Sequence, residues 1–383
     1  MQKSIDHYIH IVYNKIKLIN NNKKQKGVEQ KMQREIVASQ ADTLISFADG
    51  VQHTLVNEKE NIEMARATKT TIEYNVRGID IGSANVKDDL HNHFKSQTKA
   101  YGVPIKDGNT LTFNGTTYRY GKGKYDYNQN VKYLEKNFMP LLLSMLCTGS
   151  ELENHKIVLG LPINQYDKHK GALKEMVEQY RENKVVFNGQ ERIIRICDVE
   201  VFPEGMGVLY SLSDEDFERI GHKTRCLIVE IGGKTTDTLL LSHGEYEERE
   251  MVDFSTINET GTLKIYTDVK EYIDSNFEDA ISIEDAQDIV EGKLEYNVLG
   301  QPIDLTEVIE NIIDERFDRI LSGLRQKYPS LNSAKILLCG GGAKLFETRF
   351  RDRFKDNLLV NNNIYANAEG YKIYANHIFG IEG

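Results

Sequence analysis

The sequence predicts an α/β protein built from two related domains with a ligand site between them. From about residue 71 onward, short β-rich runs alternate with helical stretches. An apolar strand that carries an acid, one further residue and a glycine occurs twice, as Ile79-Asp80-Ile81-Gly82 and as Val229-Glu230-Ile231-Gly232. The two copies are about one domain length apart. Because ligands of open α/β sheets bind where two halves face each other, we expect a cleft lined by both copies.

Composition excludes several classes of protein. The chain has 383 residues, of which 40% are hydrophobic, which suffices for two domains with separate cores. Its 58 acidic residues outnumber 48 basic ones, and the formal charge of -10 argues against a direct nucleic-acid partner. Four scattered cysteines without CxxC pairs argue against a zinc site or a disulfide framework. With neither a signal peptide nor a membrane-length apolar run, we expect a cytoplasmic protein without a membrane partner.

Residues 1–74 differ in amino-acid composition from the rest of the chain. They contain no proline, a polar run at 20–26, and then a Gln/Glu/Ala-rich stretch that favours helix. Apolar residues three or four apart between 44 and 55 predict one amphipathic helix. We interpret this segment as a helical or partly disordered extension. A partner-binding arm is the alternative.

The first domain is predicted over 75–224 and is completed by 365–383. After a strand ending at Ile81, the run 110–120 is typical of a hairpin that turns at Asn114-Gly115. A helix over 130–146, interrupted by Pro140, follows. The remaining predicted elements are a buried strand over 156–161, a helix over 171–181 and a strand over 192–201.

The second domain is predicted over 225–364. Its first run, at 225–241, is too apolar for a surface strand and breaks at paired glycines, which indicates two strands joined by a turn. Helices are predicted over 262–275, 283–291 and 305–328, and a buried strand over 335–339 leads into three glycines. The helix over 305–328 is the clearest, because its apolar residues form one stripe: Leu305, Val308, Ile309, Ile312, Ile313, Phe317, Ile320, Leu321 and Leu324.

The turn after the first acid has the chemistry of a phosphate site. Gly82 permits close backbone approach, Ser83 offers an N–H group and a hydroxyl, and Lys87 supplies positive charge. Asp80 would face a magnesium ion, which prefers to keep several waters. The candidate phosphate contacts of this turn are Gly82, Ser83, Ala84, Asn85 and Lys87.

The second copy repeats this chemistry with a double glycine, hydroxyls and a second acid. Two such hairpins facing each other would clamp a triphosphate, with Asp80 and Glu230 holding a hydrated metal between them. Its candidate ligand contacts are Gly232, Gly233, Lys234, Thr235 and Asp237.

A third motif places three glycines between a buried strand and a helix. Without side chains, this backbone can lie against an adenine or a ribose, and the helix N-terminus favours nearby phosphate. The candidate residues are Gly340, Gly341, Gly342 and Ala343.

In this order, the three segments resemble the phosphate-1, phosphate-2 and adenosine motifs of the superfamily of actin, sugar kinases and heat-shock chaperones. The runs VLGLP at 158–162, VFPEG at 201–205 and ANAEG at 366–370 make residues 75–383 similar to the bacterial plasmid-segregation actins of the ParM/StbA family. The resemblance implies an actin-like fold of two ribonuclease-H-like domains, with ATP or GTP and Mg²⁺ in the cleft.

The resemblance also implies roles for single residues. Ser83 and Lys87 would contact phosphates and Asp80 would lie near the magnesium shell, which Glu230 would share through water. Glu204 matches the family's water-positioning glutamate, and a carboxylate beside the γ-phosphate orients or deprotonates the attacking water. The catalytic candidates are therefore Glu204, Asp80 and Glu230. At the last of these positions, the family usually has aspartate.

The implied function is an ATPase that polymerises head to tail and segregates plasmid DNA through a DNA-binding adaptor protein. Relatives that do not polymerise remain the alternative. An acid near the γ-phosphate activates a hydroxyl as readily as water, so a small-molecule kinase is the main competitor. A chaperone-type ATPase and a membrane-tethered actin relative are the others.

Overall fold

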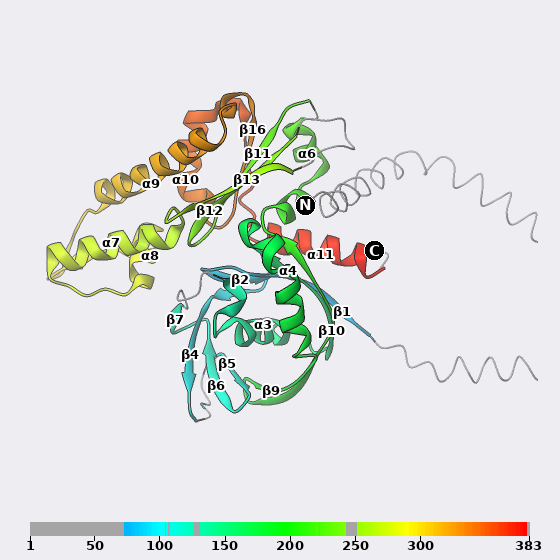
Figure 1. Cartoon of the computed structure of the whole chain (residues 1–383). Helices are drawn as coiled ribbons and strands as arrows, with labels where there is room; N and C mark the ends of the chain where they lie inside the picture. Colours follow the sequence, from blue (N-terminus) through cyan, green and yellow to red (C-terminus); the bar gives the residue numbers. More distant parts are fainter. Residues whose placement is uncertain are drawn as a thin grey trace, which may run out of the picture. The chain divides into compact units, whose positions relative to one another are not determined.

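The computed structural model describes residues 73–103, 105, 108–125, 131–221, 223–242 and 251–380. The extension predicted over 1–74, with its amphipathic helix, lies outside these residues except for its last two positions. Tyr74–His243 and Met251–Gly383 form one compact unit, whose described residues contain two large sheets and a two-stranded hairpin (Figure 1).

The first sheet has the strand order β3-β2-β1-β8-β10-β9-β5-β6-β4-β7. At its centre β1, β8 and β10 run parallel to one another, and β1 and the second half of β8 are buried as continuous runs. The hairpin predicted at Asn114-Gly115 joins β5 and β6 of this sheet, with positive φ at both turn residues. The bounds are β1 Asn75–Ile81, β2 Asn85–Asp88, β3 His93–Lys95, β4 Gln97–Tyr101, β5 Thr110–Phe113, β6 Thr116–Tyr120, β7 Lys124–Tyr125, β8 Asn154–Leu161, β9 Glu182–Phe187 and β10 Gln190–Pro203.

The helix predicted over 130–146 is wrong in its first part. The helix begins only at Phe138, and Pro140 lies in its first turn, where the missing N–H has no intrahelical partner to lose. A short 3₁₀ turn over Lys132–Leu134 precedes it. The next helix starts directly after Pro162, earlier than its sequence pattern indicates. The helices of this part are α3 Phe138–Cys147, α4 Ile163–Glu178, α5 Met206–Ser211 and α6 Asp214–Ile220.

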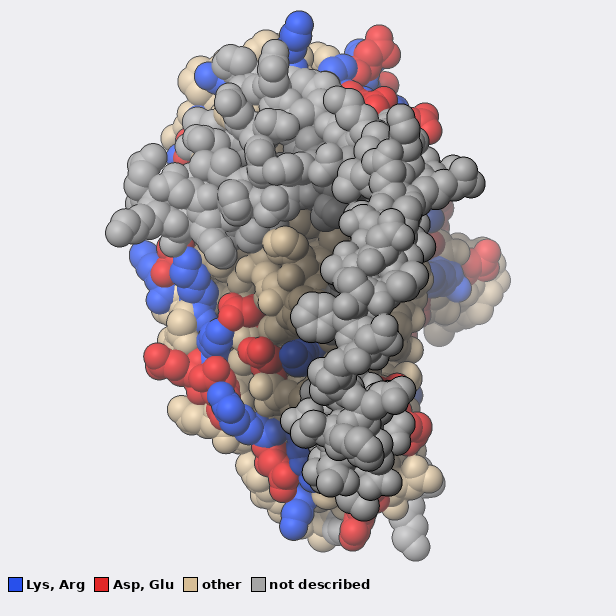
Figure 2. All heavy atoms as spheres, turned by 90° about the vertical axis from the view of Figure 1, so that its right-hand side faces the viewer, with Lys and Arg blue, Asp and Glu red and all other residues tan. Residues whose placement is uncertain are grey.

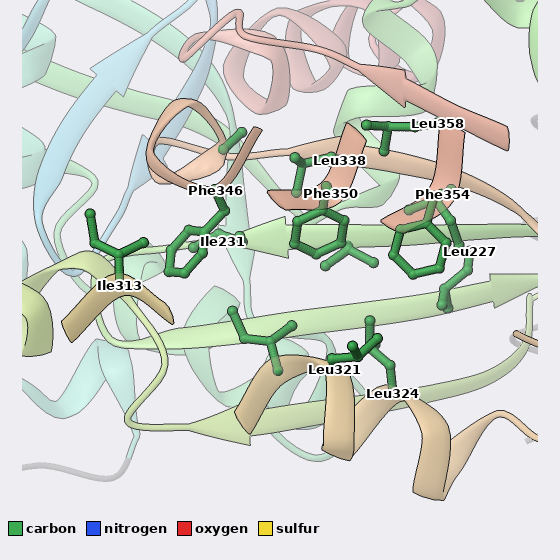
Figure 3. Packing of buried hydrophobic residues seen from close by; sticks show 14 of the residues in the cluster. Leu227, Ile231, Ile313, Leu321, Leu324, Leu338, Phe346, Phe350, Phe354 and Leu358 are labelled. Atoms are coloured by element: carbon green, nitrogen blue, oxygen red, sulfur yellow. The ribbon is translucent and has the colours of Figure 1, made fainter. Parts of the chain in front are cut away.

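The second sheet has the order β13-β12-β11-β16-β17. Side chains from α9 and α10 converge on β11 and β16 to form its core (Figure 3). Phe346, Phe350 and Phe354 come from one face of α10, and burying each aromatic ring contributes about 1.5–3 kcal/mol. The bounds are β11 Cys226–Ile231, β12 Thr235–Leu241, β13 Met251–Asn258, β16 Lys335–Cys339, β17 Leu358–Val360, α7 Thr262–Phe277, α8 Ile283–Val290, α9 Thr306–Lys327 and α10 Ala343–Phe354, with a small hairpin of β14 Asn297–Val298 and β15 Gln301–Pro302.

Both sheets contain the same local arrangement around the two sequence motifs. β1 pairs antiparallel with β2 and parallel with β8, and β11 pairs antiparallel with β12 and parallel with β16. In the register, Asp80 lies opposite Lys87 and Glu230 lies opposite Asp237. Each acid therefore sits at the end of a strand just before a glycine turn.

The last helix, α11 Ala366–Ile378, packs on the first sheet against β1 and β8 and on α5. Its approach to α5 is very close, because a Cβ at Gly370 would lie 1.9 Å from the carbonyl oxygen of Gly207. The predicted domain junction at 224/225 lies between the end of α6 at Ile220 and the start of β11 at Cys226. The domain boundaries themselves stay a prediction.

The described surface mixes charges of both signs. On the coloured part of the face in Figure 2, basic and acidic side chains are interspersed rather than gathered into one broad area. None of the helices in the described ranges has the length and apolar character that crossing a bilayer requires.

Candidate functional site

A cavity of about 140 Å³ brings the predicted site residues together. Both glycine turns line it, as do Glu204 and one glycine of the third motif. The predicted residues that line it are Asp80, Gly82, Ser83, Ala84, Asn85, Lys87, Glu204, Glu230, Gly232, Gly233, Lys234, Thr235, Asp237 and Gly341.

The two turns touch each other across the cavity. A Cβ added to Gly233 would lie 2.7 Å from the Cβ of Ala84 and 3.0 Å from its backbone nitrogen. Real Cβ atoms do not approach a neighbour that closely, so only glycine fits at this position. Residues of both turns therefore border one common space, and glycine turns of this kind suit an anion.

Asp80 is paired within the cavity. Its Oδ2 accepts a hydrogen bond from Lys87 Nζ at 2.8 Å, and both side chains are largely buried. Burial raises the pKa of Asp80, but the positive charges of Lys87 and then Lys132 outweigh it and hold that pKa below its ordinary value. Asp80 is thus an ionised carboxylate at the cavity wall.

Glu204 forms a buried ion pair with Lys132, a residue that the sequence reasoning missed. Lys132 lies in the 3₁₀ turn before α3, in a region predicted as plain helix. No sequence motif marks it as a site residue. Burial raises the pKa of Glu204 despite the opposing charge of Lys132. A carboxylate with a raised pKa is better suited to accept a proton from water.

Glu230 lies between the hairpins and α11. Its Oε1 accepts a hydrogen bond from Asn367 Nδ2 at 2.6 Å, and its Oε2 is buried with no hydrogen-bond partner in the described part of the chain. Burial, and after it the charges of Glu204 and Asp80, raise the pKa of Glu230 well above its ordinary value. The unpartnered Oε2 is the atom of this side chain that a further cation could contact.

Asp237 is engaged differently. Thr235 Oγ1 donates to its Oδ2 at 2.9 Å and Thr256 Oγ1 donates to its Oδ1 at 2.5 Å. Burial raises the pKa of Asp237, and the two threonine hydroxyls lower it by a smaller amount. Asp237 thereby fastens the second turn to β13.

Only part of the third motif reaches the cavity. Gly341 lines it, whereas Gly340, Gly342 and Ala343 are not among the lining residues. Gly340 has φ +91°, and a Cβ there would lie 2.5 Å from the carbonyl oxygen of Ile231. These residues pack the strand-to-helix turn against the end of β11 and so place Gly341.

Sequence reasoning also missed a group of hydrogen-bonded side chains that line the cavity. Glu291 Oε1 accepts hydrogen bonds from Tyr266 at 3.1 Å and from Gln287 at 2.7 Å. All three line the cavity and come from α7, α8 and the residue after α8, where they form no sequence motif. Thr262, Leu263, Tyr125 and Pro162 complete the lining.

The donor set fits Mg²⁺. Five carboxylates line the cavity beside two lysines, and the Oε2 of Glu230 is a buried ligand atom without a hydrogen-bond partner in the described residues. No three acidic, histidine or cysteine side chains within the described ranges converge closely enough to hold a metal directly. An ion here would accordingly be held through waters and phosphate oxygens, with Asp80 and Glu230 nearest.

Comparisons with known proteins agree with this architecture. Residues 78–207 match the family model "Actin like proteins N terminal domain", and residues 228–352 match "Archaeal actin homologue MreB-like, C-terminal". The chain is an actin-like protein. The resemblance that the three motifs carry, and the predicted actin-like α/β fold, are confirmed.

Solved structures resemble this actin-like chain along most of its length. A 15-stranded ParM filament from Clostridium botulinum has a TM-score of 0.68 at 19% identity, covering 79% of this chain and 99% of that one. Ta0583, an archaeal actin homolog, in complex with ADP, has a TM-score of 0.66 at 21% identity, covering 79% and 99%. MreB5 of Spiroplasma citri bound to ADP has a TM-score of 0.55 at 19% identity, covering 79% and 98%. No curated protein sequence matches significantly.

Proposed function

We propose that this actin-like protein binds ATP and Mg²⁺ and hydrolyses ATP as it assembles into head-to-tail filaments. One observation carries the proposal: two glycine hairpins, one from each sheet, touch at a cavity that five carboxylates and two lysines line. A site of this kind suits a triphosphate with its metal. Two of the similar solved structures contain ADP.

In this proposal, each group of residues has a separate role in the reaction. The N–H groups of the two turns and the ammonium of Lys87 bind the phosphates, and Glu204 orients a water for attack and takes its proton. Lys132 holds the Glu204 carboxylate in place. Mg²⁺, when bound, neutralises phosphate charge that develops in the transition state. Gly341 and the group around Glu291 form the wall for the nucleoside.

Assembly is proposed from the same arrangement and from the relatives. The cavity is lined by both sheets, so nucleotide occupancy sets how they face each other and thereby the contact surfaces between subunits. The ParM relative forms a filament. We further propose that the filament acts in the cytoplasm and moves plasmid DNA through a DNA-binding adaptor, in keeping with a formal charge of -10.

High-speed sedimentation tests the assembly. The wild-type protein is expected to pellet with Mg²⁺ and ATP and to stay in the supernatant without nucleotide. Gly233→Val forces the two turns apart, because its Cβ alone would collide with Ala84, and should abolish both nucleotide binding and pelleting.

Gly171→Ala is the matched control, since Gly171 lies in α4 with open space around its added Cβ. It should pellet like the wild type. Tight ATP binding by the wild type without pelleting at any protein concentration would contradict filament formation and favour a small-molecule kinase.

A further inference from the structure

The carboxylate of Glu230 is held from the last helix rather than from its own sheet. Asn367 of α11 donates from Nδ2 to Glu230 Oε1 at 2.6 Å. The other end of the same amide, Oδ1, accepts the backbone N–H of Gly205 at 3.1 Å. Asn367 is 5% exposed, so water does not compete strongly for either bond.

Gly205 directly follows Glu204, and it adopts φ +80°. A Cβ at this position would lie 2.7 Å from Leu239 Cδ1 and 3.2 Å from Glu230 Oε2. The turn that carries Glu204 is therefore packed against Glu230 and bonded to Asn367. One side-chain amide thus contacts both the backbone of the Glu204 turn and the carboxylate of Glu230.

Helix α11 provides a rigid base for this amide. Besides the Gly370–Gly207 contact, a Cβ at Gly207 would lie 2.8 Å from the carbonyl oxygen of Asn367 and 2.9 Å from its Oδ1. Tyr371, one turn further along α11, is fully buried against Gly160. The backbones of α11 and α5 are thereby in direct contact and the Tyr371 side chain packs on β8, so Asn367 has little freedom to move.

The hydrogen-bond pattern leaves a defined free atom. Because Oε1 of Glu230 is occupied by Asn367, the unpartnered oxygen in the described structure is Oε2. An aspartate at position 230 has one methylene less, which would draw the carboxylate back from Asn367. The glutamate at 230 and the asparagine at 367 are therefore complementary in length.

We infer that Asn367 is the positioning residue of the site: it orients Glu230 toward the bound cation and couples that orientation to the turn that carries Glu204. The inference rests on the proposed nucleotide function. Second-sphere partners of this kind typically change metal affinity about 10- to 100-fold when they are removed.

The variant Asn367→Asp tests the two hydrogen bonds separately, because it removes only one of them. The new carboxylate keeps an acceptor for Gly205 N–H but loses the donor that Glu230 requires. We expect the affinity for a fluorescent ATP analogue in Mg²⁺ to fall about tenfold or more, with less than about a twofold change in EDTA. A purely structural role would change both affinities alike.

A polarity exchange tests the pair without any enzymatic readout. In the double variant Asn367→Asp with Glu230→Gln, the new glutamine amide donates to the new carboxylate and restores the bond in reverse. Its thermal midpoint without nucleotide should exceed the value expected from adding the two single changes. Its Mg²⁺-dependent affinity should stay low, since the charge of Glu230 is gone.

Asn183→Asp is the matched control. Asn183 is also buried, and its amide donates to the carbonyl of Tyr180 away from the cavity. It should lower the thermal midpoint but leave the ratio of affinities in Mg²⁺ and EDTA unchanged. An unchanged ratio in Asn367→Asp, or strict additivity in the double variant, would overturn the inference. Failure of the wild type to bind nucleotide at all would overturn the proposed function instead, while the thermal cycle still tests the pair.

Discussion

Glu204→Gln is expected to slow phosphate release about 100- to 10,000-fold while ATP binding stays close to the wild-type value. Glutamine keeps the size of the side chain and one oxygen that accepts from Lys132, but it cannot take a proton from water. Alanine at the same position should show the same loss, with lower stability because buried Lys132 then lacks its partner. Single-turnover phosphate release, at nucleotide concentrations that saturate binding, measures the effect.

The pair Glu200–Lys174 provides the control for this prediction. It is also a glutamate–lysine ion pair near the end of β10, but it is half-exposed and lies outside the cavity. Glu200→Gln should release phosphate at the wild-type rate. Wild-type turnover in Glu204→Gln would remove Glu204 from the proposed catalytic role.

Asp80→Ala should reduce binding itself. The carboxylate faces the cavity as an anion, so its loss removes one of the two groups proposed to hold a hydrated Mg²⁺. We expect the affinity for ATP with Mg²⁺ to fall about 10- to 100-fold, and nucleotide-dependent pelleting to be lost with it. Isothermal titration with ATP, in Mg²⁺ and in EDTA, separates the metal-dependent part.

The same change also leaves Lys87 buried without its carboxylate. Breaking a buried pair in this way typically costs about 3–5 kcal/mol of stability, so a thermal melt must accompany the titration. Asp80→Asn keeps a hydrogen bond to Lys87 and is the variant to use if the alanine form unfolds. Wild-type Mg²⁺-dependent affinity in a folded Asp80→Asn protein would exclude Asp80 from the metal shell.

The glycine turns could be predicted from sequence because their requirements are local. Each consists of an acid at the end of an apolar strand, a glycine two residues later, and polar residues in the turn, all within ten positions. Two such units in one chain predicted two facing sheets, and the register places Asp80 opposite Lys87 as a turn of that length requires. The fold class followed from the same observations.

The residues that sequence reasoning missed owe their place to tertiary packing. Lys132 reaches Glu204 across 72 positions in the chain, and Asn367 reaches Glu230 across 137. The run at 366–370 was recognised as part of the family resemblance, but nothing in its letters shows that the amide of Asn367 contacts a carboxylate of the other sheet. The group around Glu291 likewise lies on amphipathic helices without a motif.

The predicted start of the helix over 130–146 was wrong for a related reason. Pro140 inside an apolar run resembles an interruption, yet in the structure it lies in the first turn of α3, a position that the run alone does not reveal.

The triple glycine was predicted to line the ligand site as a whole. Close packing of Gly340 and Gly342 on Ile231 leaves Gly341 facing the cavity.

The most direct test of nucleotide-driven assembly follows light scattering and phosphate release together after ATP and Mg²⁺ are added to the purified full chain, with ADP and GTP in parallel and electron micrographs at the plateau. The proposed function predicts that scattering rises with the triphosphate, that filaments appear in the micrographs, and that phosphate release lags behind assembly. Phosphate release without any rise in scattering over a wide range of protein concentration would contradict it.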